Sequence, residues 1–196
     1  MTDAFRFEHL SLPEVVHIVP RKIPDVRGEF VKTLVAEQFR HNAINPLFVE
    51  NFESESRRGV VRGLHYQLDP CAEGKLVRVT RGRVFDVVVD VRRGSPRFGK
   101  WTAAYLSDEA YDALWVPPGF AHGFLALEEP TRVLYQVTSS FCPEHYRGIR
   151  WNDSAIGIEW PSIGVTIASE KDGSLPELKD AETNYQYTEK GPLEES

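Results

Sequence analysis

The chain has 196 residues, 41% of them hydrophobic and 27% charged, which is the balance of a soluble globular protein with one domain. Its formal net charge of −6 disfavours nucleic acid and anionic membrane surfaces as partners. No basic segment followed by an apolar stretch opens the chain, and no apolar run approaches the ~20 residues that span a bilayer, so we expect a cytoplasmic protein with no membrane association.

Short β-like segments separated by turn residues follow one another along the chain. We expect strands at residues 15–19, 30–35, 75–80, 83–91, 101–106, 113–116, 120–127 and 131–138. Residues 25–28 form a turn between the first two, and residues 37–41 and 108–111 each suit a short helical turn. Many short strands, punctuated by 14 Gly and 13 Pro, predict an all-β sandwich or barrel with a few short helices.

The clearest pair of strands lies at residues 75–80 and 83–91. Both runs are rich in β-branched residues and flank an Arg-Gly connection, which predicts a hairpin. Because side chains alternate along a strand, Phe85 and the alternate valines after it share one face, whereas Asp86 and Asp90 point to the other.

From residue 176 onward the chain is polar and acidic, with few apolar residues before Leu193. We therefore expect a domain of residues 1–175 and a loosely packed C-terminal tail of residues 176–196. The two cysteines, Cys71 and Cys142, lie far apart and form no C-x-x-C pair, so we expect two reduced thiols.

Two of the six histidines, His65 and His122, stand in glycine- and aromatic-rich surroundings. Glycine permits sharp turns and close approach of the backbone, which makes these two candidates for function. A metal site is the other interpretation of such histidines. No H-x-H pair or carboxylate at matching spacing follows His65, so we expect no metal site.

Several cations could hold a diphosphate, although each could equally be a solvated surface residue. They are Arg27, Arg62, Lys75 and Arg78, whereas the neighbouring Arg57 and Arg58 fit a solvated surface better. The sequence has no P-loop, no dinucleotide-binding G-x-G-x-x-G and no serine nucleophile elbow. The pattern of residues alone therefore indicates a barrel with a histidine-containing pocket.

Eight segments, in order, resemble the dTDP-4-dehydrorhamnose 3,5-epimerase family. They are residues 25–30 (DVRGEF), 61–67 (VRGLHYQ), 75–79 (KLVRV), 82–90 (GRVFDVVVD), 94–101 (GSPRFGKW), 114–125 (LWVPPGFAHGFL), 148–153 (GIRWND) and 169–172 (SEKD). This resemblance, from about residue 7 to residue 175, implies a jelly-roll (cupin-like) β-barrel and a homodimer. It also implies epimerisation beside a C4 ketone, with neither a metal nor an organic cofactor.

The resemblance assigns roles to individual residues. His65 matches the catalytic base, Asp172 the carboxylate that orients its imidazole, Lys75 the cation near the enolate oxygen, and Tyr135 the acid on the opposite face of the sugar. Arg62 matches a phosphate-contacting arginine, His122 and Lys171 belong to the same pocket, and Arg27 and Phe30 match residues that reach into the neighbouring subunit's site.

Three positions depart from the family, and two of them, Lys32 and Glu50, are associated with the nucleotide end of the site. Lys32 stands where Glu is common, Glu50 where Gln is common, and Phe141 where Tyr is common. These departures leave the proton chemistry intact but leave the nucleotide and the sugar open.

We therefore expect inversion of C3 and C5 of a nucleoside-diphosphate 4-keto-6-deoxyhexose, with dTDP as the nucleotide. One alternative is an epimerase that inverts only C3 or only C5 on a different nucleotide sugar. The other is a non-catalytic sugar-nucleotide-binding barrel, since a fold alone does not confer activity.

Overall fold

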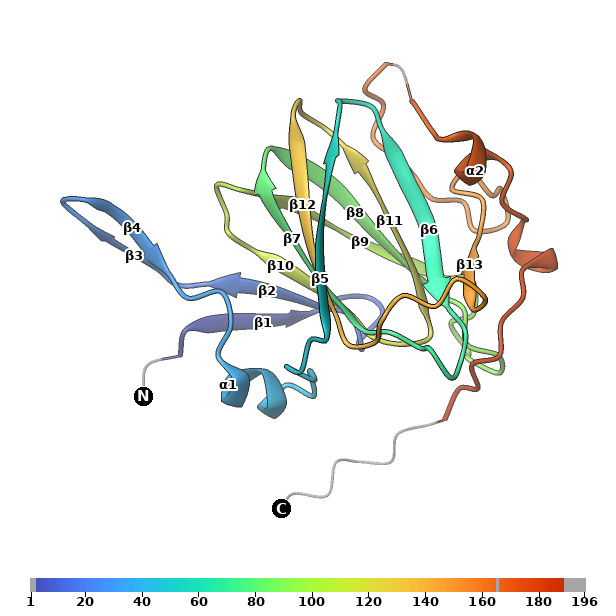
Figure 1. The fold of residues 1–196 in the computed structure, drawn as a ribbon, viewed down its shortest axis with the longest axis horizontal. Helices are drawn as coiled ribbons and strands as arrows, with labels where there is room; N and C mark the ends of the chain where they lie inside the picture. Colours follow the sequence, from blue (N-terminus) through green and yellow to red (C-terminus); the bar gives the residue numbers. More distant parts are fainter. Residues whose placement is uncertain (1–2, 165, 189–196) are drawn as a thin grey trace.

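Two antiparallel β-sheets pack face to face in the computed structural model, which describes residues 3–164 and 166–188 (Figure 1). The six-stranded sheet runs in the order β1 (Phe5–His9), β2 (Val16–Pro20), β10 (Ala113–Val116), β7 (Lys75–Arg81), β12 (Thr131–Val137) and β5 (Glu50–Ser56). The five-stranded sheet runs in the order β13 (Tyr146–Gly148), β6 (Val61–Gln67), β11 (Phe120–Ala126), β8 (Arg83–Asp90) and β9 (Trp101–Ser107). This jelly-roll-like, mostly β architecture confirms the predicted fold class.

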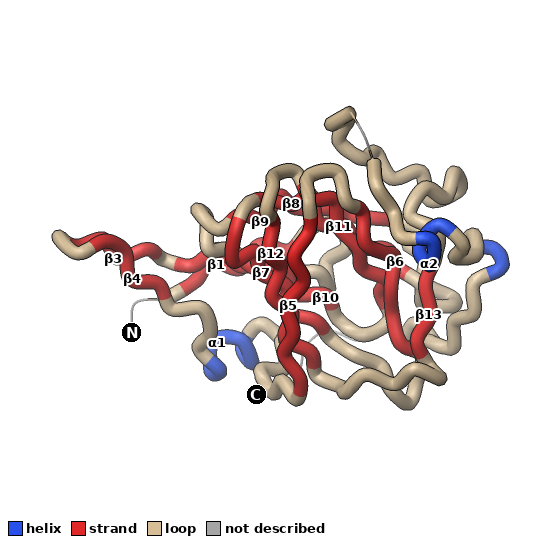
Figure 2. The backbone as a smooth tube through the Cα atoms, turned by 45° about the horizontal axis from the view of Figure 1, so that its top comes forward, coloured by secondary structure: helices blue, strands red, loops and turns tan. Residues whose placement is uncertain are grey.

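Three smaller features surround the two sheets. A hairpin of β3 (Lys22–Asp25) and β4 (Gly28–Val31) projects away from them (Figure 1). Helix α1 (Ala36–His41) lies near the N-terminal strands, and the loops that carry α2 (Glu170–Gly173) lie beside β6 and β13 (Figure 2). Among the described residues, no helix is long and apolar enough to cross a membrane.

The main core fills the space between the sheets. Val77 and Val133 from the six-stranded sheet meet Val88 and Phe124 from the five-stranded sheet, and all four side chains are fully buried. Burial of such side chains is the principal stabilising contribution to a fold of this kind. A second apolar cluster, which includes Phe85 and the alternate valines of β8, covers the outer face of the five-stranded sheet. The predicted division of β8 into two faces is therefore confirmed.

The hairpin predicted across residues 75–91 is wrong. Strand β7 pairs with β10 and β12, whereas β8 pairs with β11 and β9 in the other sheet. Gly82, which has a positive φ of 77°, turns the chain from one sheet to the other. Its N–H donates to Asp108 Oδ2 at 2.9 Å and its carbonyl accepts from the Asp108 N–H at 3.1 Å, so the turn is anchored to the β9–β10 loop.

The predicted strand at residues 30–35 ends early, at Val31. Its partner strand begins at Lys22, which pairs with Val31, so residues beyond that point have no neighbour with which to extend the ladder. The helical turn predicted at residues 37–41 is confirmed as α1. Residues 108–111 form a turn closed by a hydrogen bond from the Tyr111 N–H to the Ser107 carbonyl.

Residues 176–188 are not the loosely packed segment that their polarity predicts. A short 3₁₀ helix spans Leu178–Asp180, and the Thr183 hydroxyl donates to the Val91 carbonyl at 2.7 Å. Tyr185 is buried in the outer cluster and donates its hydroxyl to the Gln67 carbonyl. The buried side chains of Thr183 and Tyr185 therefore help to hold this segment against the barrel. The remaining predicted tail, residues 189–196, lies outside the described residues.

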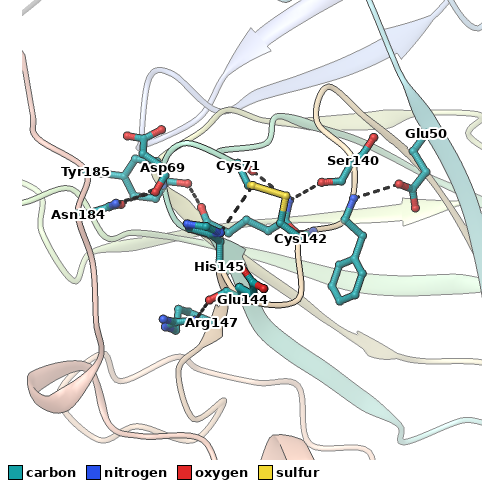
Figure 3. Close-up of a disulfide and its surroundings, with 12 residues drawn as sticks. Glu50, Asp69, Cys71, Ser140, Cys142, Glu144, His145, Arg147, Asn184 and Tyr185 are labelled. Carbon is teal, nitrogen blue, oxygen red and sulfur yellow. Dashed lines mark hydrogen bonds between the residues drawn. A yellow bond between two sulfur atoms is a disulfide. The ribbon is translucent and has the colours of Figure 1, made fainter.

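The prediction of two reduced thiols is also wrong, because Cys71 and Cys142 form a disulfide (Figure 3). Cys71 lies in the loop that leads from β6 to β7, and Cys142 in the loop that leads from β12 to β13. Because β13 pairs with β6, the fold brings together these two loops, which are distant in sequence.

Candidate active site

A cavity of about 530 Å³ opens inside the barrel, and both sheets contribute side chains to its wall. Its lining residues are Glu50, Phe52, Ser54, Arg62, His65, Glu73, Lys75, His122, Phe124, Tyr135, Val137, Phe141, Tyr146, Ser169, Lys171 and Asp172. Nine of the twelve predicted site residues are in this list, including the four predicted to be catalytic. The other three, Arg27, Phe30 and Lys32, are not.

His65 and Asp172 form a hydrogen-bonded pair in the cavity wall. His65 Nε2 lies 2.8 Å from Asp172 Oδ1, and the second carboxylate oxygen accepts from the Gly63 N–H at 3.2 Å. Ser169, directly before α2, accepts from the Asp172 N–H and so fixes the start of that short helix. The carboxylate holds the Nε2 proton, which leaves the lone pair on Nδ1.

An irregularity in β6 lets Arg62 and His65 both line the cavity, although residues three apart on a regular strand point to opposite faces. The β6–β11 register shifts here, where Gly63 faces Gly123. A Cβ atom on Gly63, whose φ is 131°, would lie 2.6 Å from the Gly123 Cα. A Cβ atom on Gly123 would lie 2.6 Å from the Arg62 carbonyl oxygen. Glycine at both positions therefore allows the close approach that places His65.

Burial and charge set the protonation of the His65–Asp172 pair. Burial lowers the pKa of His65 below its ordinary value, and the nearby Lys75 and Lys171 act in the same direction, whereas Asp172 opposes them. Burial alone would raise the pKa of Asp172, but hydrogen bonds from His65 and Gly63 hold it below its ordinary value. Near neutral pH the pair is therefore a neutral imidazole held by a carboxylate, which suits a proton acceptor.

Lys75, the first residue of β7, forms an ion pair inside the cavity. Its Nζ lies 2.9 Å from Oε1 of Glu73, and both side chains are only 9% exposed. The sequence interpretation missed Glu73. Its signal is the spacing: Glu73 stands two residues before Lys75, and two residues is the period at which side chains share one face of an extended chain.

Tyr135 lies on β12, the neighbour of β7, and points into the same cavity. Its ring stacks on Phe52 at a centroid distance of 4.8 Å and meets the His122 ring edge-on at 6.1 Å. Burial raises the pKa of its hydroxyl well above the ordinary value, so the phenol carries its proton at neutral pH.

A second histidine–carboxylate pair lies deeper in the barrel. His122 Nε2 is 2.7 Å from Asp86 Oδ1, and both side chains are buried. Burial raises the pKa of Asp86, against the opposing influence of His122. The sequence predicted which face of the strand carries Asp86, but not that Asp86 pairs with His122.

The cavity mouth is built from aromatic and charged side chains. Tyr146 lies beside the His65 ring at 5.3 Å and under Lys171, whose Nζ is 4.2 Å from the Tyr146 ring centroid. Phe141 packs edge-on against Tyr146 at 5.5 Å and donates its backbone N–H to Glu50 Oε2 at 3.1 Å. The sequence interpretation missed Tyr146, although it lies only five residues after Phe141.

Arg62 is exposed at the edge of the cavity, and its guanidinium is oriented by neutral groups. Nε donates to Ser56 Oγ and Nη2 donates to the Glu55 carbonyl, both at 3.0 Å. Among the described residues no carboxylate lies within salt-bridge distance of Arg62, so its charge is available to an anion.

Arg27, Phe30 and Lys32 lie on or just after the projecting β3–β4 hairpin. All three are exposed, Phe30 by 58%. Among the described residues, Arg27 pairs only with Asp25, two residues before it. The hairpin projects away from the two sheets of its own chain (Figure 1). Across residues 3–164 and 166–188, no three His, Cys, Asp or Glu side chains gather as metal ligands would.

The chain resembles proteins of known family over most of its length. The family model described as dTDP-4-dehydrorhamnose 3,5-epimerase matches residues 9–180. A Sinorhizobium fredii protein of that name is 50% identical over 186 residues, which cover 94% of this chain and 95% of the relative. This chain belongs to that family. A second member, from Pseudomonas aeruginosa, is 45% identical over 174 residues, 88% of this chain and 96% of its own.

Solved structures of family members share the fold. The Legionella pneumophila dTDP-6-deoxy-D-glucose-3,5-epimerase in complex with dTDP-4-keto-L-rhamnose superposes with a TM-score of 0.85 at 37% identity, covering 90% of this chain and 94% of its own. The Streptomyces bikiniensis 3′-monoepimerase in complex with dTDP-quinovose gives a TM-score of 0.82 at 30% identity, with coverages of 87% and 86%. The present family member is accordingly an enzyme of the isomerase class.

Proposed function

We propose that this enzyme inverts C3 and C5 of dTDP-4-dehydro-6-deoxyglucose and so forms dTDP-4-dehydrorhamnose. The observation that carries the proposal is the meeting of His65, Asp172, Lys75 and Tyr135 in one cavity of a chain from this family. Hydrogens on C3 and C5 are weakly acidic because the C4 carbonyl can accept the electron pair. The enzyme must supply a base, a positive partner for the oxygen and an acid on the other face.

His65 takes the proton. Its lone pair on Nδ1 accepts the proton from carbon, the C–H electron pair forms a double bond to C4, and the carbonyl π electrons move onto the oxygen to give an enolate. Asp172 stabilises the resulting imidazolium, as carboxylates do in other histidine–carboxylate pairs. Proton transfer of this kind contributes about 10²–10⁴-fold to rate.

Lys75 and Tyr135 complete the inversion. The Lys75 ammonium, whose side chain is largely shielded from water, stabilises the enolate oxygen. The Tyr135 O–H bond then breaks and its proton joins the carbon from the face opposite His65. Inversion requires this second group, since a base that returned its own proton would restore the starting configuration. His65 and Tyr135 regain their initial protonation by exchange with solvent.

The diphosphate and nucleotide occupy the cavity mouth in this proposal. The unpaired guanidinium of Arg62 suits bidentate contact with a phosphate, and Lys171 adds a second positive charge. Glu50 and Phe141, joined by a backbone hydrogen bond, offer a carboxylate and an exposed aromatic ring for the nucleobase.

Deuterium incorporation tests the reaction. Incubation of the enzyme with dTDP-4-dehydro-6-deoxyglucose in deuterated water should place deuterium at both C3 and C5, detected by NMR, and His65→Asn should place none. No incorporation by the wild-type enzyme would refute the proposal. Deuterium at C3 alone would support the second candidate, a mono-epimerase, which is favoured by the similarity to the Streptomyces bikiniensis 3′-monoepimerase.

The projecting hairpin supports a homodimer in which each subunit completes its partner's site. Arg27 and Phe30 are exposed on an arm that reaches beyond its own barrel, so a second copy would cover the apolar ring and pair the charge with substrate. Light scattering should give the mass of two chains.

Mixing two inactive variants tests the shared site more directly. The Arg27→Ala subunit keeps His65 but contributes a defective β3–β4 hairpin to its partner's site. The His65→Ala subunit lacks the base but contributes an intact hairpin. After exchange of subunits, the mixture should recover about a quarter of wild-type activity, because half the dimers are mixed and each has one complete site. No recovery, in a mixture shown to contain mixed dimers, would contradict the shared site.

A further inference from the structure

The Glu73–Lys75 ion pair places a carboxylate in the cavity, and the mechanism above gives this carboxylate no role. Nζ and Oε1 are 2.9 Å apart, and each side chain is 91% shielded from solvent. Removing two charges from water is costly unless they are paired with good geometry, so neither side chain would keep this position without the other.

The backbone between the two residues is held firmly. The Gly74 N–H donates to Thr138 Oγ1 at 2.8 Å, and the Gly74 carbonyl accepts from the Thr138 N–H at 3.0 Å. A Cβ atom on Gly74 would lie 2.3 Å from the Trp115 ring, so the indole packs directly against this backbone. Glu73 and Lys75 therefore emerge from a fixed support and both line the cavity.

We infer that Glu73 is a positioning residue for the epimerisation, one that holds the Lys75 ammonium in the orientation that stabilises the C4 enolate. This inference rests on the proposed function. A lysine on a flexible four-carbon stem loses considerable side-chain entropy when it is held in one place, and an ion pair at its end offsets that loss before substrate arrives. The carboxylate accepts from one of the three N–H donors, which leaves two for the substrate oxygen.

Other charged groups around Lys75 do not fill this role. His65 is neutral and already held by Asp172, and Asp86 is held by His122. Among the described residues, Glu73 is the only carboxylate within salt-bridge distance of Lys75. Its removal would leave the ammonium free to turn toward solvent or toward Asp86.

Two substitutions separate the hydrogen bond from the charge. Glu73→Ala removes both, and we expect it to lower kcat by about tenfold or more while KM and the affinity for dTDP change less than about twofold. Glu73→Gln keeps an oxygen acceptor for Lys75 and should recover most of that loss. A matched control is Glu177→Ala, because Glu177 also pairs with a lysine two residues on, Lys179, at 3.1 Å but at the exposed surface. The control should leave kcat unchanged.

A double-mutant cycle tests whether Glu73 acts through Lys75. In the Lys75→Met background, Glu73→Ala should change kcat by less than about twofold, because the group it positions is gone. An unchanged kcat in Glu73→Ala would overturn the inference, as would an equal loss of kcat with and without Lys75. Calorimetric binding of dTDP confirms that each variant is folded. Failure of the proposed function is distinguishable, since the wild-type enzyme itself would then incorporate no deuterium.

Discussion

Reduction of the Cys71–Cys142 disulfide should lower the thermal stability of the enzyme. The bond joins the β6–β7 loop to the β12–β13 loop across a sequence separation of 71 residues. Constraint of the unfolded chain by a loop of this length is worth about 4 kcal/mol at 25 °C. For a protein of this size, 1 kcal/mol corresponds to roughly 2–4 °C in Tm, so the upper bound on the decrease is about 8–16 °C.

The structure also indicates why the fold should survive reduction. The buried Gln67 amide donates to the carbonyls of Cys71 and Ser140 at 3.0 and 3.2 Å and accepts from the Cys142 N–H at 2.6 Å. Figure 3 shows that the disulfide lies close to Ser140. The next residue, Phe141, donates its N–H to Glu50. The loops thus remain joined by hydrogen bonds, and the cost should appear in Tm rather than as loss of the native state.

Calorimetry with and without a phosphine reductant measures the effect. The oxidised enzyme should unfold at the higher temperature, and a Cys71→Ser/Cys142→Ser variant should match the reduced enzyme and ignore the reductant. Equal Tm values for oxidised and reduced wild type would refute the reasoning, as would two free thiols per chain in a titration of the unreduced, denatured enzyme.

Three further predictions concern His65 and its support. Burial lowers the pKa of His65 below 6.5, and the base must be neutral to accept a proton. A plot of kcat/KM against pH should therefore fall toward acid pH with an apparent pKa below 6.5. An apparent pKa above 6.5 would contradict the assignment of His65 as the base. Asp172→Asn should reduce deuterium exchange by about 10²–10⁴-fold with little change in dTDP affinity, and a decrease in affinity alone would argue for a binding role. Gly63→Ala should cost about 1–3 kcal/mol in urea unfolding, because its Cβ would meet the Gly123 backbone at 2.6 Å, whereas an unchanged midpoint would count against the close approach.

Local patterns predicted individual strands well but not how they pair. The predicted strand at residues 113–116 matches β10 residue for residue, and the one at 131–138 differs from β12 only at its end. A turn glycine between two β-rich runs looks the same in a hairpin and at a corner between sheets. The distinction at Gly82 depends on Asp108, which no local pattern connects to it. Strands β5, β6 and β13 were not predicted as strands because their hydrophobic alternation is weak or interrupted, and pairing rather than pattern defines them.

The same limit applied to the site. Resemblance indicated His65, Lys75, Tyr135 and Asp172, and the structure places them around one cavity. Glu73 was missed because the importance of a carboxylate depends on which cation lies across from it in space. The Cys71–Cys142 disulfide was missed for a related reason, since the pairing of β6 with β13, not the spacing of the cysteines, brings the two loops together.

The distribution of paired and unpaired charges explains how an acidic chain can select an anionic substrate. The net charge of −6 would repel a nucleoside diphosphate at long range, but the acids deep in the cavity are each paired with a base: Asp172 with His65, Asp86 with His122, and Glu73 with Lys75. At the cavity mouth, two cations are not paired in this way. Within residues 3–164 and 166–188, Arg62 and Lys171 have no carboxylate within salt-bridge distance. In the proposed function, paired groups would therefore surround the carbon to be deprotonated, and Arg62 and Lys171 would remain available to the diphosphate.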